Sequence, residues 1–176
     1  LKVFYDGGNL CLSHNGNLTN AASLRQELAK EGHVFQTTVD SEVVLSLIAR
    51  SRKKTLEERV AEAANAIKGA FAILIMSNDK LIAFRDPYGF RPLCLGRLDH
   101  GWVVASETCA LDLVGAHYVR DIKPGEMIVI DDADKEPTSL MYAQHQPEHR
   151  AHCIFEFVYF ARPDSIMDGE SIYLAR

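Results

Sequence analysis

The stretch Gly69-Ala70-Phe71-Ala72-Ile73-Leu74-Ile75-Met76 decides the fold class, because the spacing of apolar residues changes there. Its continuous apolar run is typical of a short strand that is covered on both faces. Ahead of it, apolar residues recur at helical spacing, and after it short apolar runs are separated by turn signals. There is no regular alternation of strand and helix. The pattern therefore favours an α+β fold with a largely antiparallel sheet over a doubly wound fold.

Three helices are predicted ahead of this stretch, over residues 20–31, 40–51 and 55–68. Asn20 is a candidate cap for the first helix, and Gly32 ends its pattern. Thr55 and Glu58 have the spacing of a capping box at the start of the third helix. We expect these helices to lie on the outside of the sheet.

Short strands are predicted over residues 10–12, 81–84, 93–95, 102–105, 127–130 and 154–160, with a short helix over 109–114 and a loop over 163–169. Residues 13–17 are expected to form a turn directly after the first of these strands. Two sheets packed face to face would explain why the apolar run at 71–76 shows no polar alternation.

The length of 176 residues indicates one domain of ordinary size. With 47% hydrophobic and 24% charged residues, the composition is that of a folded globular chain. The net charge of -5 and the missing basic face argue against a nucleic-acid partner. The longest apolar run is far shorter than the roughly 20 residues of a membrane span. Four widely spaced cysteines argue against a disulfide framework or a self-contained zinc site. We expect a soluble, cytoplasmic domain without a membrane partner.

The segment Ser13-His14-Asn15-Gly16-Asn17 carries the first candidate for chemistry. The Asn15 side-chain amide and the Gly16 backbone N–H could donate two hydrogen bonds to one oxyanion, as acyl transfer requires. The alternative is a tight turn, and composition alone favours it. His14 could serve as a general base at neutral pH, although a structural role is the commoner one for a lone histidine.

Asp40 is the second candidate, because a carboxylate at a helix start can bind the α-ammonium group of an amino-acid substrate. The alternative is a plain helix cap, which the residue type alone favours. His145, His149 and His152 are spaced as on one helix face. Pro147 interrupts any helix there, so no metal site is expected from them.

Several stretches resemble the class II glutamine amidotransferases, which are N-terminal-nucleophile hydrolases. They are Leu12-Ser13-His14-Asn15-Gly16-Asn17, Phe35-Gln36-Thr37 and Asp40-Ser41-Glu42-Val43. The downstream strings RDPYGFRPLCLG (85–96), VVASETCALD (103–112), IKPGEM (122–127) and FVYFARPDS (157–165) are similar to those of the amidophosphoribosyltransferase family. The resemblance covers nearly the whole chain in order, and it implies a four-layer α-β-β-α sandwich, incomplete at its N-terminus.

The resemblance also implies a mechanism. An amino-terminal cysteine attacks the side-chain amide of glutamine, with its own α-amine as base, and forms a γ-glutamyl thioester that water then hydrolyses. By the same resemblance, Asn15 and Gly16 form the oxyanion hole and Asp40 binds the α-ammonium group of the substrate. The arginine that binds the α-carboxylate is expected to precede residue 1.

The chain departs from this pattern at its start, where Leu1 stands and the Cys-Gly start is missing. Cys11 is no substitute, because it lies in a predicted strand and has no free α-amine. We expect residues 1–152 to form a glutaminase domain that lacks its nucleophile segment and is inactive unaided. Residues 153–176 are expected to lead into a phosphoribosyltransferase domain outside this chain.

In the family, that further domain uses Mg²⁺ and adds ammonia to phosphoribosyl pyrophosphate, which gives 5-phosphoribosylamine for purine synthesis. The resemblance therefore implies an enzyme with glutamine and phosphoribosyl pyrophosphate as substrates, and a homo-oligomer when full length. Cys153 matches a position that ligates a [4Fe–4S] cluster in one branch of the family. A plain buried thiol is the equal alternative, and no cofactor is expected in residues 1–176 alone.

Two competing interpretations stay open from the sequence. The chain could belong to another class II amidotransferase, of the glucosamine 6-phosphate synthase or asparagine synthetase type. It could also be a non-catalytic module that has kept the fold. The string at 157–165 distinguishes the first alternative, because we would not expect it in those enzymes.

Overall fold

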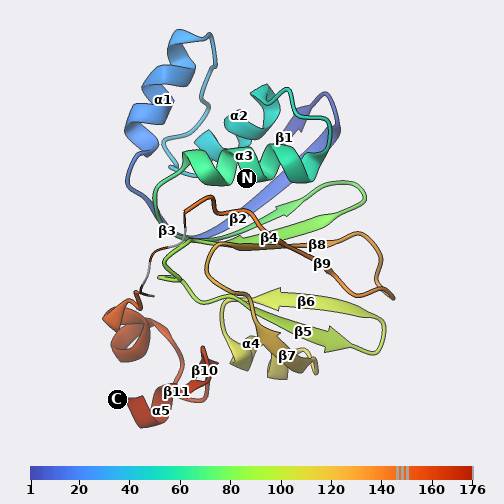
Figure 1. The fold of residues 1–176 in the computed structure, drawn as a ribbon, viewed down its shortest axis with the longest axis vertical. Helices are drawn as coiled ribbons and strands as arrows, with labels where there is room; N and C mark the ends of the chain where they lie inside the picture. The colour runs from blue at the N-terminus through green and yellow to red at the C-terminus, as the bar shows by residue number, and fades with distance from the viewer. Residues whose placement is uncertain (146, 148, 150, 176) are drawn as a thin grey trace.

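The computed structural model describes residues 1–145, 147, 149 and 151–175, and its centre is an antiparallel sheet in the order β1-β2-β3-β4-β8-β9 (Figure 1). Its strands are β1 (Lys2–Tyr5), β2 (Gly8–Leu18), β3 (Gly69–Met76), β4 (Leu81–Arg85), β8 (Glu126–Ile130) and β9 (Thr138–Met141). Strand β3 lies between β2 and β4, and the deciding stretch of the sequence is thus an inner strand.

A second, smaller sheet has the order β6-β5-β7 and packs against one face of the first (Figure 1). Its strands are β5 (Cys94–Leu98), β6 (Gly101–Ala105) and β7 (His117–Asp121). Apolar side chains of the two sheets meet in one cluster, which includes Ala72, Ala83, Leu95 and Ile128. The short helix α4 (Thr108–Leu113) follows β6, and its Leu111 packs with Cys94 of β5.

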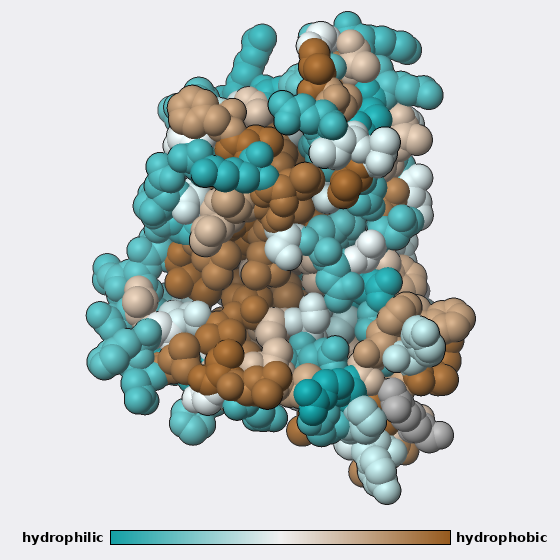
Figure 2. All heavy atoms as spheres, turned by 180° about the vertical axis from the view of Figure 1, so that it is seen from behind, coloured by the Kyte–Doolittle hydropathy of each residue, from teal (hydrophilic) through white to brown (hydrophobic). Residues whose placement is uncertain are grey.

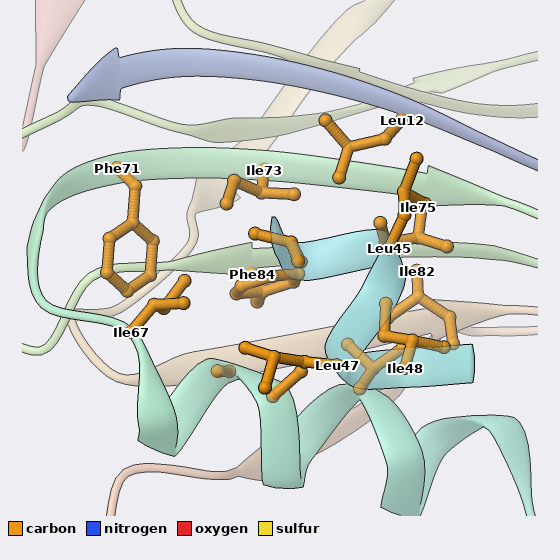
Figure 3. Close-up of a cluster of buried hydrophobic side chains, with 14 of the residues drawn as sticks. Leu12, Leu45, Leu47, Ile48, Ile67, Phe71, Ile73, Ile75, Ile82 and Phe84 are labelled. Carbon is orange, nitrogen blue, oxygen red and sulfur yellow. The ribbon is translucent and has the colours of Figure 1, made fainter. Parts of the chain in front are cut away.

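The other face of the large sheet is covered by α1 (Ala21–Lys30), α2 (Glu42–Arg50) and α3 (Leu56–Ala66). Side chains of α2 point at the inner strands, where the Phe71 and Phe84 rings stack edge to face with centroids 6.0 Å apart (Figure 3). Helices, large sheet, small sheet and α4 make up the expected α-β-β-α order. The prediction of an α+β two-sheet sandwich with outer helices is confirmed.

The predicted N-terminal cap is present at α3 and absent at α1. At α3 the capping box forms as predicted, since Glu58 N–H donates to Thr55 Oγ1 and Thr55 N–H donates to the Glu58 carboxylate. At α1, Asn20 makes no side-chain cap. Its amide instead bonds the Lys68 N–H and the Ala66 C=O, tying the end of α3 to the start of α1.

The predicted strand at 10–12 is confirmed as part of β2, but the predicted turn at 13–17 is wrong. Strand β2 continues from Gly8 to Leu18, and residues 11–18 pair with β3 in an unbroken register, Leu18 opposite Gly69. An Asn-Gly pair favours a hairpin only when the chain can pair with itself. Here β3 supplies a partner along the whole segment.

The predicted strand at 154–160 is also wrong, because residues 154–155 are helical and Glu156–Phe160 form a π-helix, η1. Glu156 is buried there and pairs with Arg91. Residues 163–169, expected as loop, include one strand of a small hairpin, β10 (Ile166–Met167) with β11 (Glu170–Ser171), before α5 (Ile172–Ala175). The domain division at residue 152 stays a prediction.

The surface shows where apolar side chains remain uncovered. From the side opposite to Figure 1, apolar residues gather along the middle of the molecule, with polar ones around them (Figure 2). Within the described ranges, no helix has the length and apolar character needed to cross a membrane.

A buried ion pair joins the sandwich to its carboxyl-terminal segment. Arg85, at the end of β4, is 1% exposed and donates from both terminal guanidinium nitrogens to the Asp168 carboxylate, at 2.9 and 2.7 Å. It also donates to the backbone C=O groups of Gly89, Arg91 and Ile122. The polar hydrogens of this buried side chain are therefore matched to acceptors, as burial requires.

Replacing Asp168 by asparagine is expected to lower the free energy of unfolding by about 3 kcal/mol, because the buried guanidinium loses the one carboxylate that it bonds directly. Asparagine tolerates the positive φ of 49° at this position, so backbone strain stays small. Urea denaturation measures the change. The matched control is Asp164→Asn in the exposed Arg162–Asp164 pair, which should leave stability unchanged. Equal effects of the two variants would contradict a special role for the buried pair.

Candidate active site

One edge of β2 carries the backbone donors of the candidate site. Leu12 N–H donates to Leu1 C=O at 2.8 Å, and Leu18 N–H donates to the Asp40 carboxylate at 2.9 Å. In an antiparallel strand, backbone groups of alternate residues point to the same edge. Gly16 lies an even number of positions along the strand from Leu12 and from Leu18. Its N–H therefore points to this edge too. Strand β1 pairs with β2 only as far as Cys11 and leaves the edge open at Gly16.

Gly16 is required by the close approach of β3. Its φ is +142°, and a Cβ atom at this position would lie 2.0 Å from the Ala70 carbonyl oxygen. The N–H and C=O of Phe71, which faces Gly16, both bond to Asp86 instead of β2. This pairing is consistent with a Gly16 N–H that points away from β3.

Asn15 is exposed and its side chain lies on the opposite face of β2 from Leu12 and Leu18. Its Nδ2 donates to Ser106 Oγ at 3.1 Å. Ser106 follows β6, so this bond joins the two sheets across 91 residues. Sequence reasoning missed Ser106, although it lies within the string at 103–112.

Asp40 lies in the loop between α1 and α2, and its carboxylate is fixed from two sides. Oδ2 accepts from Leu18 N–H at 2.9 Å, and Oδ1 accepts from Ser41 N–H at 2.7 Å. The residue preceding α2 is Ser41, so Asp40 is not the N-cap in the strict sense. Its side chain remains 26% exposed. A fixed, partly exposed carboxylate beside an open strand edge can accept a cationic group.

The loop that carries Asp40 is held by two residues that sequence reasoning did not single out. Glu42 in the first turn of α2 accepts from the N–H groups of Gln36 and Thr37 and from the Thr37 hydroxyl. Burial opposes ionisation of Glu42, but these donors lower its pKa overall. Arg25 of α1 donates to the C=O groups of Thr37 and Val39. The loop is therefore anchored to both helices.

His14 packs beside Asp40, with Nδ1 3.5 Å from Oδ1 and a side chain only 6% exposed. Burial lowers the pKa of the imidazole, and the neighbouring carboxylate partly offsets this effect. The Nε2 atom is buried without a hydrogen-bond partner among the described residues. The enclosure of this imidazole, which leaves it little room to meet a substrate, favours the structural interpretation of His14 over the general base.

The start of β3 is fixed by the buried carboxylate of Asp86. It accepts the backbone N–H groups of Phe71, Tyr88, Phe90 and Arg91, at 3.0 to 3.2 Å. Burial raises the pKa of Asp86, while these donors act in the opposite direction. The loop after β4 therefore does more than turn the chain, because Asp86 sets the position of Phe71 opposite Gly16.

The structure does not bring a set of cysteines to Cys153. All four cysteines are free thiols, and Cys153 is partly exposed ahead of η1. No group of three or more His, Cys, Asp or Glu side chains in the described ranges could hold a metal ion. A cluster needs about four ligands, so residues 1–176 by themselves do not fit one. His152 instead lies 3.5 Å from Asp168.

Comparison with known proteins places this chain within a family. Residues 3–113, which include Asn15, Gly16, Asp40 and Ser106, match the family model described as glutamine amidotransferase domain. The chain is 44% identical over 97% of its length to an amidophosphoribosyltransferase of Bacillus subtilis, and 43% identical over 96% to one of Methanocaldococcus jannaschii. These matches cover 35% and 39% of the relatives, so the chain spans little more than a third of their length.

A solved structure agrees with the sequence matches. The glutamine phosphoribosylpyrophosphate amidotransferase of Bacillus subtilis, complexed with ADP and GMP, superposes with a TM-score of 0.92 at 42% identity. The superposition covers 98% of this chain and 37% of that one. A class II domain protein from Silicibacter pomeroyi, at 18% identity and a TM-score of 0.52, shows likeness of fold alone. The resemblance inferred from the motifs is confirmed.

Gly16→Ala is expected to destabilise the protein more than Gly32→Ala. Both glycines have positive φ, but a Cβ at Gly32 meets nothing within 4 Å, whereas at Gly16 it meets the β3 backbone. We expect the free energies of unfolding of the two variants to differ by about 2 kcal/mol or more, because the added Cβ at position 16 pushes β2 away from β3. Thermal or urea unfolding gives both values. If the two variants lose equal stability, the close pairing at Gly16 does not constrain the sheet.

Proposed function

Since the chain belongs to the glutamine amidotransferase domain family, we propose that it supplies the oxyanion hole and the ammonium-binding carboxylate of a class II glutaminase site. One observation carries the proposal. The Gly16 N–H and the Asp40 carboxylate lie along the same open edge of β2, and the Asn15 amide extends from the residue next to Gly16. Such an edge offers donors for a developing negative charge and an acceptor for a fixed positive one.

In the proposed reaction, a cysteine thiol attacks the side-chain carbonyl carbon of glutamine. The carbonyl oxygen becomes negatively charged in the tetrahedral intermediate, and Asn15 Nδ2 and Gly16 N–H donate to it. Ammonia leaves with the proton of the thiol, and water then cleaves the thioester to release glutamate. Throughout, Asp40 binds the α-ammonium group of glutamine, and this contact positions the side-chain carbonyl carbon at the oxyanion donors. The nucleophile in this proposal is an amino-terminal cysteine that is not among residues 1–176.

For the complete protein we propose the amidophosphoribosyltransferase reaction of its relatives, in which the ammonia converts phosphoribosyl pyrophosphate to 5-phosphoribosylamine for purine synthesis. The extensive match to enzymes of that name supports this. Mg²⁺ in a phosphoribosyltransferase domain, a [4Fe–4S] cluster with Cys153 as one ligand, and a homo-oligomeric state belong to the same proposal. So does a cytoplasmic location, although some plant relatives carry the name chloroplastic.

Asn15→Ala in the complete protein is expected to lower the glutaminase turnover by about 10²–10³, the usual effect of losing one oxyanion donor. Synthesis from added ammonia should continue, because that reaction needs no oxyanion hole on β2. Steady-state assays with glutamine and with ammonium salts measure both activities. Asn9→Ala, on the same face of β2, is the matched control and should leave both unchanged. Equal loss of the two activities would show that Asn15 acts through folding. If the complete, unsubstituted protein is folded but hydrolyses no glutamine, the chain is a non-catalytic module.

Asp40→Asn is expected to raise the KM for glutamine by about 10- to 100-fold with a smaller effect on kcat. The ammonium contact is a charged hydrogen bond that is present in ground state and transition state alike. Glutamine titrations under steady-state conditions give both constants, and Asp112→Asn, an exposed carboxylate on α4, serves as the control. An Asp40 variant with unchanged KM and reduced stability would return this residue to a purely structural role.

A further inference from the structure

We propose that Ser106 is a positioning residue that orients the Asn15 amide toward the oxyanion. The inference rests on the proposed function, and it gives a role to the serine of the string at 103–112 that the reaction itself does not use. It starts from the hydrogen bond that Asn15 Nδ2 donates to Ser106 Oγ at 3.1 Å.

An asparagine side chain needs such a partner because its amide has a hydrogen-bond acceptor, the oxygen, and a donor, the NH2 group, of nearly the same shape. Rotated by half a turn, Asn15 would present its carbonyl oxygen to the developing oxyanion and repel it. In the structure the Ser106 hydroxyl oxygen accepts one of the two Nδ2 hydrogens, so that Nδ2 and not the carbonyl oxygen lies next to Ser106. The second hydrogen on the same nitrogen remains for the oxyanion. Positioned donors of this kind contribute more to catalysis than mobile ones.

The residues on either side of Ser106 are held by hydrogen bonds. The C=O of the preceding residue, Ala105, accepts from Cys94 Sγ at 3.3 Å. The carboxylate of the following residue, Glu107, accepts from Arg162 N–H at 2.7 Å and from the Ser165 hydroxyl at 2.9 Å. These contacts fix the segment on both sides of Ser106, from β5 and from residues 162–165. A serine in a rigid segment can hold a neighbouring amide in one orientation.

The position of Ser106 also links the two sheets at the site. Asn15 belongs to the large sheet, whereas Ser106 directly follows β6 of the small one. Thr108 Oγ1, two residues on, accepts from Ile166 N–H at 2.9 Å. The amide orientation thus depends on how the small sheet and the carboxyl-terminal segment sit against β2.

The test uses the complete protein and a matched pair, Ser106→Thr and Ser106→Val, which have nearly the same shape and differ in the hydroxyl. Ser106→Val and Ser106→Ala should lower kcat for glutamine hydrolysis about tenfold, the kinetic equivalent of one neutral hydrogen bond. The KM for glutamine should stay unchanged, because the bound substrate carries no oxyanion before the nucleophile attacks. Ser106→Thr should retain most of kcat. Ser23→Ala, an exposed serine on α1, is the control and should change neither constant.

A double-mutant cycle separates positioning from a merely structural role. In the Asn15→Ala background, removing the Ser106 hydroxyl should cause no further loss of kcat, since there is no amide left to orient. Full additivity of the two losses, or a Ser106→Val variant with wild-type kcat, would overturn the inference while leaving the function intact. An Asn15→Ala variant with normal glutaminase turnover would instead overturn the proposed function itself. Ammonia-dependent synthesis and the melting temperature, measured for each variant, identify losses that come from misfolding.

Discussion

The pairing of β2 with β3 is the constraint on which the site depends. An Asn-Gly pair by itself favours a turn, but pairing with β3 keeps this segment extended in the sheet. Glycine at position 16 lets the two backbones approach where any side chain would strike the Ala70 carbonyl. The buried Asp86 carboxylate fixes the opposite strand by holding Phe71. Because this register is fixed, the donors of β2 lie along one open edge in a fixed order.

Three of the four layers of the sandwich contribute residues to the site at that edge. The large sheet supplies the Asn15 amide and the Gly16 N–H. The helical layer supplies Asp40, on a loop that Glu42 and Arg25 hold in place. The small sheet supplies Ser106, which bonds the amide from the other side. The carboxyl-terminal segment is attached to the same framework by buried or partly buried ion pairs, including that of Arg85 with Asp168. A site assembled in this way keeps its geometry only while the layers stay packed.

The sequence predicted the parts of this structure that are decided locally. The capping box at Thr55 needs only four consecutive residues, and the two-sheet sandwich follows from the change of periodicity at Gly69. The rest depends on partners distant in the chain. The segment 13–17 is a strand because β3 lies beside it, and residues 154–160 are helical although their apolar run is typical of a strand. Strands β1, β7 and β9 were not predicted, and β7 and β9 have mostly exposed side chains. Asn15, Gly16 and Asp40 as a proposed site came from the family resemblance, since composition alone favoured a turn and a cap.

The most direct test of the proposed site is a crystal structure of the complete protein after reaction with a glutamine analogue that carries an electrophilic ketone in place of the side-chain amide. The adduct formed by the nucleophile leaves an oxygen where the oxyanion develops. We expect this oxygen to accept hydrogen bonds from both Asn15 Nδ2 and Gly16 N–H, while the α-ammonium group of the analogue binds Asp40. An adduct whose oxygen lies away from β2, or whose ammonium group pairs with a different carboxylate, would contradict the proposed site.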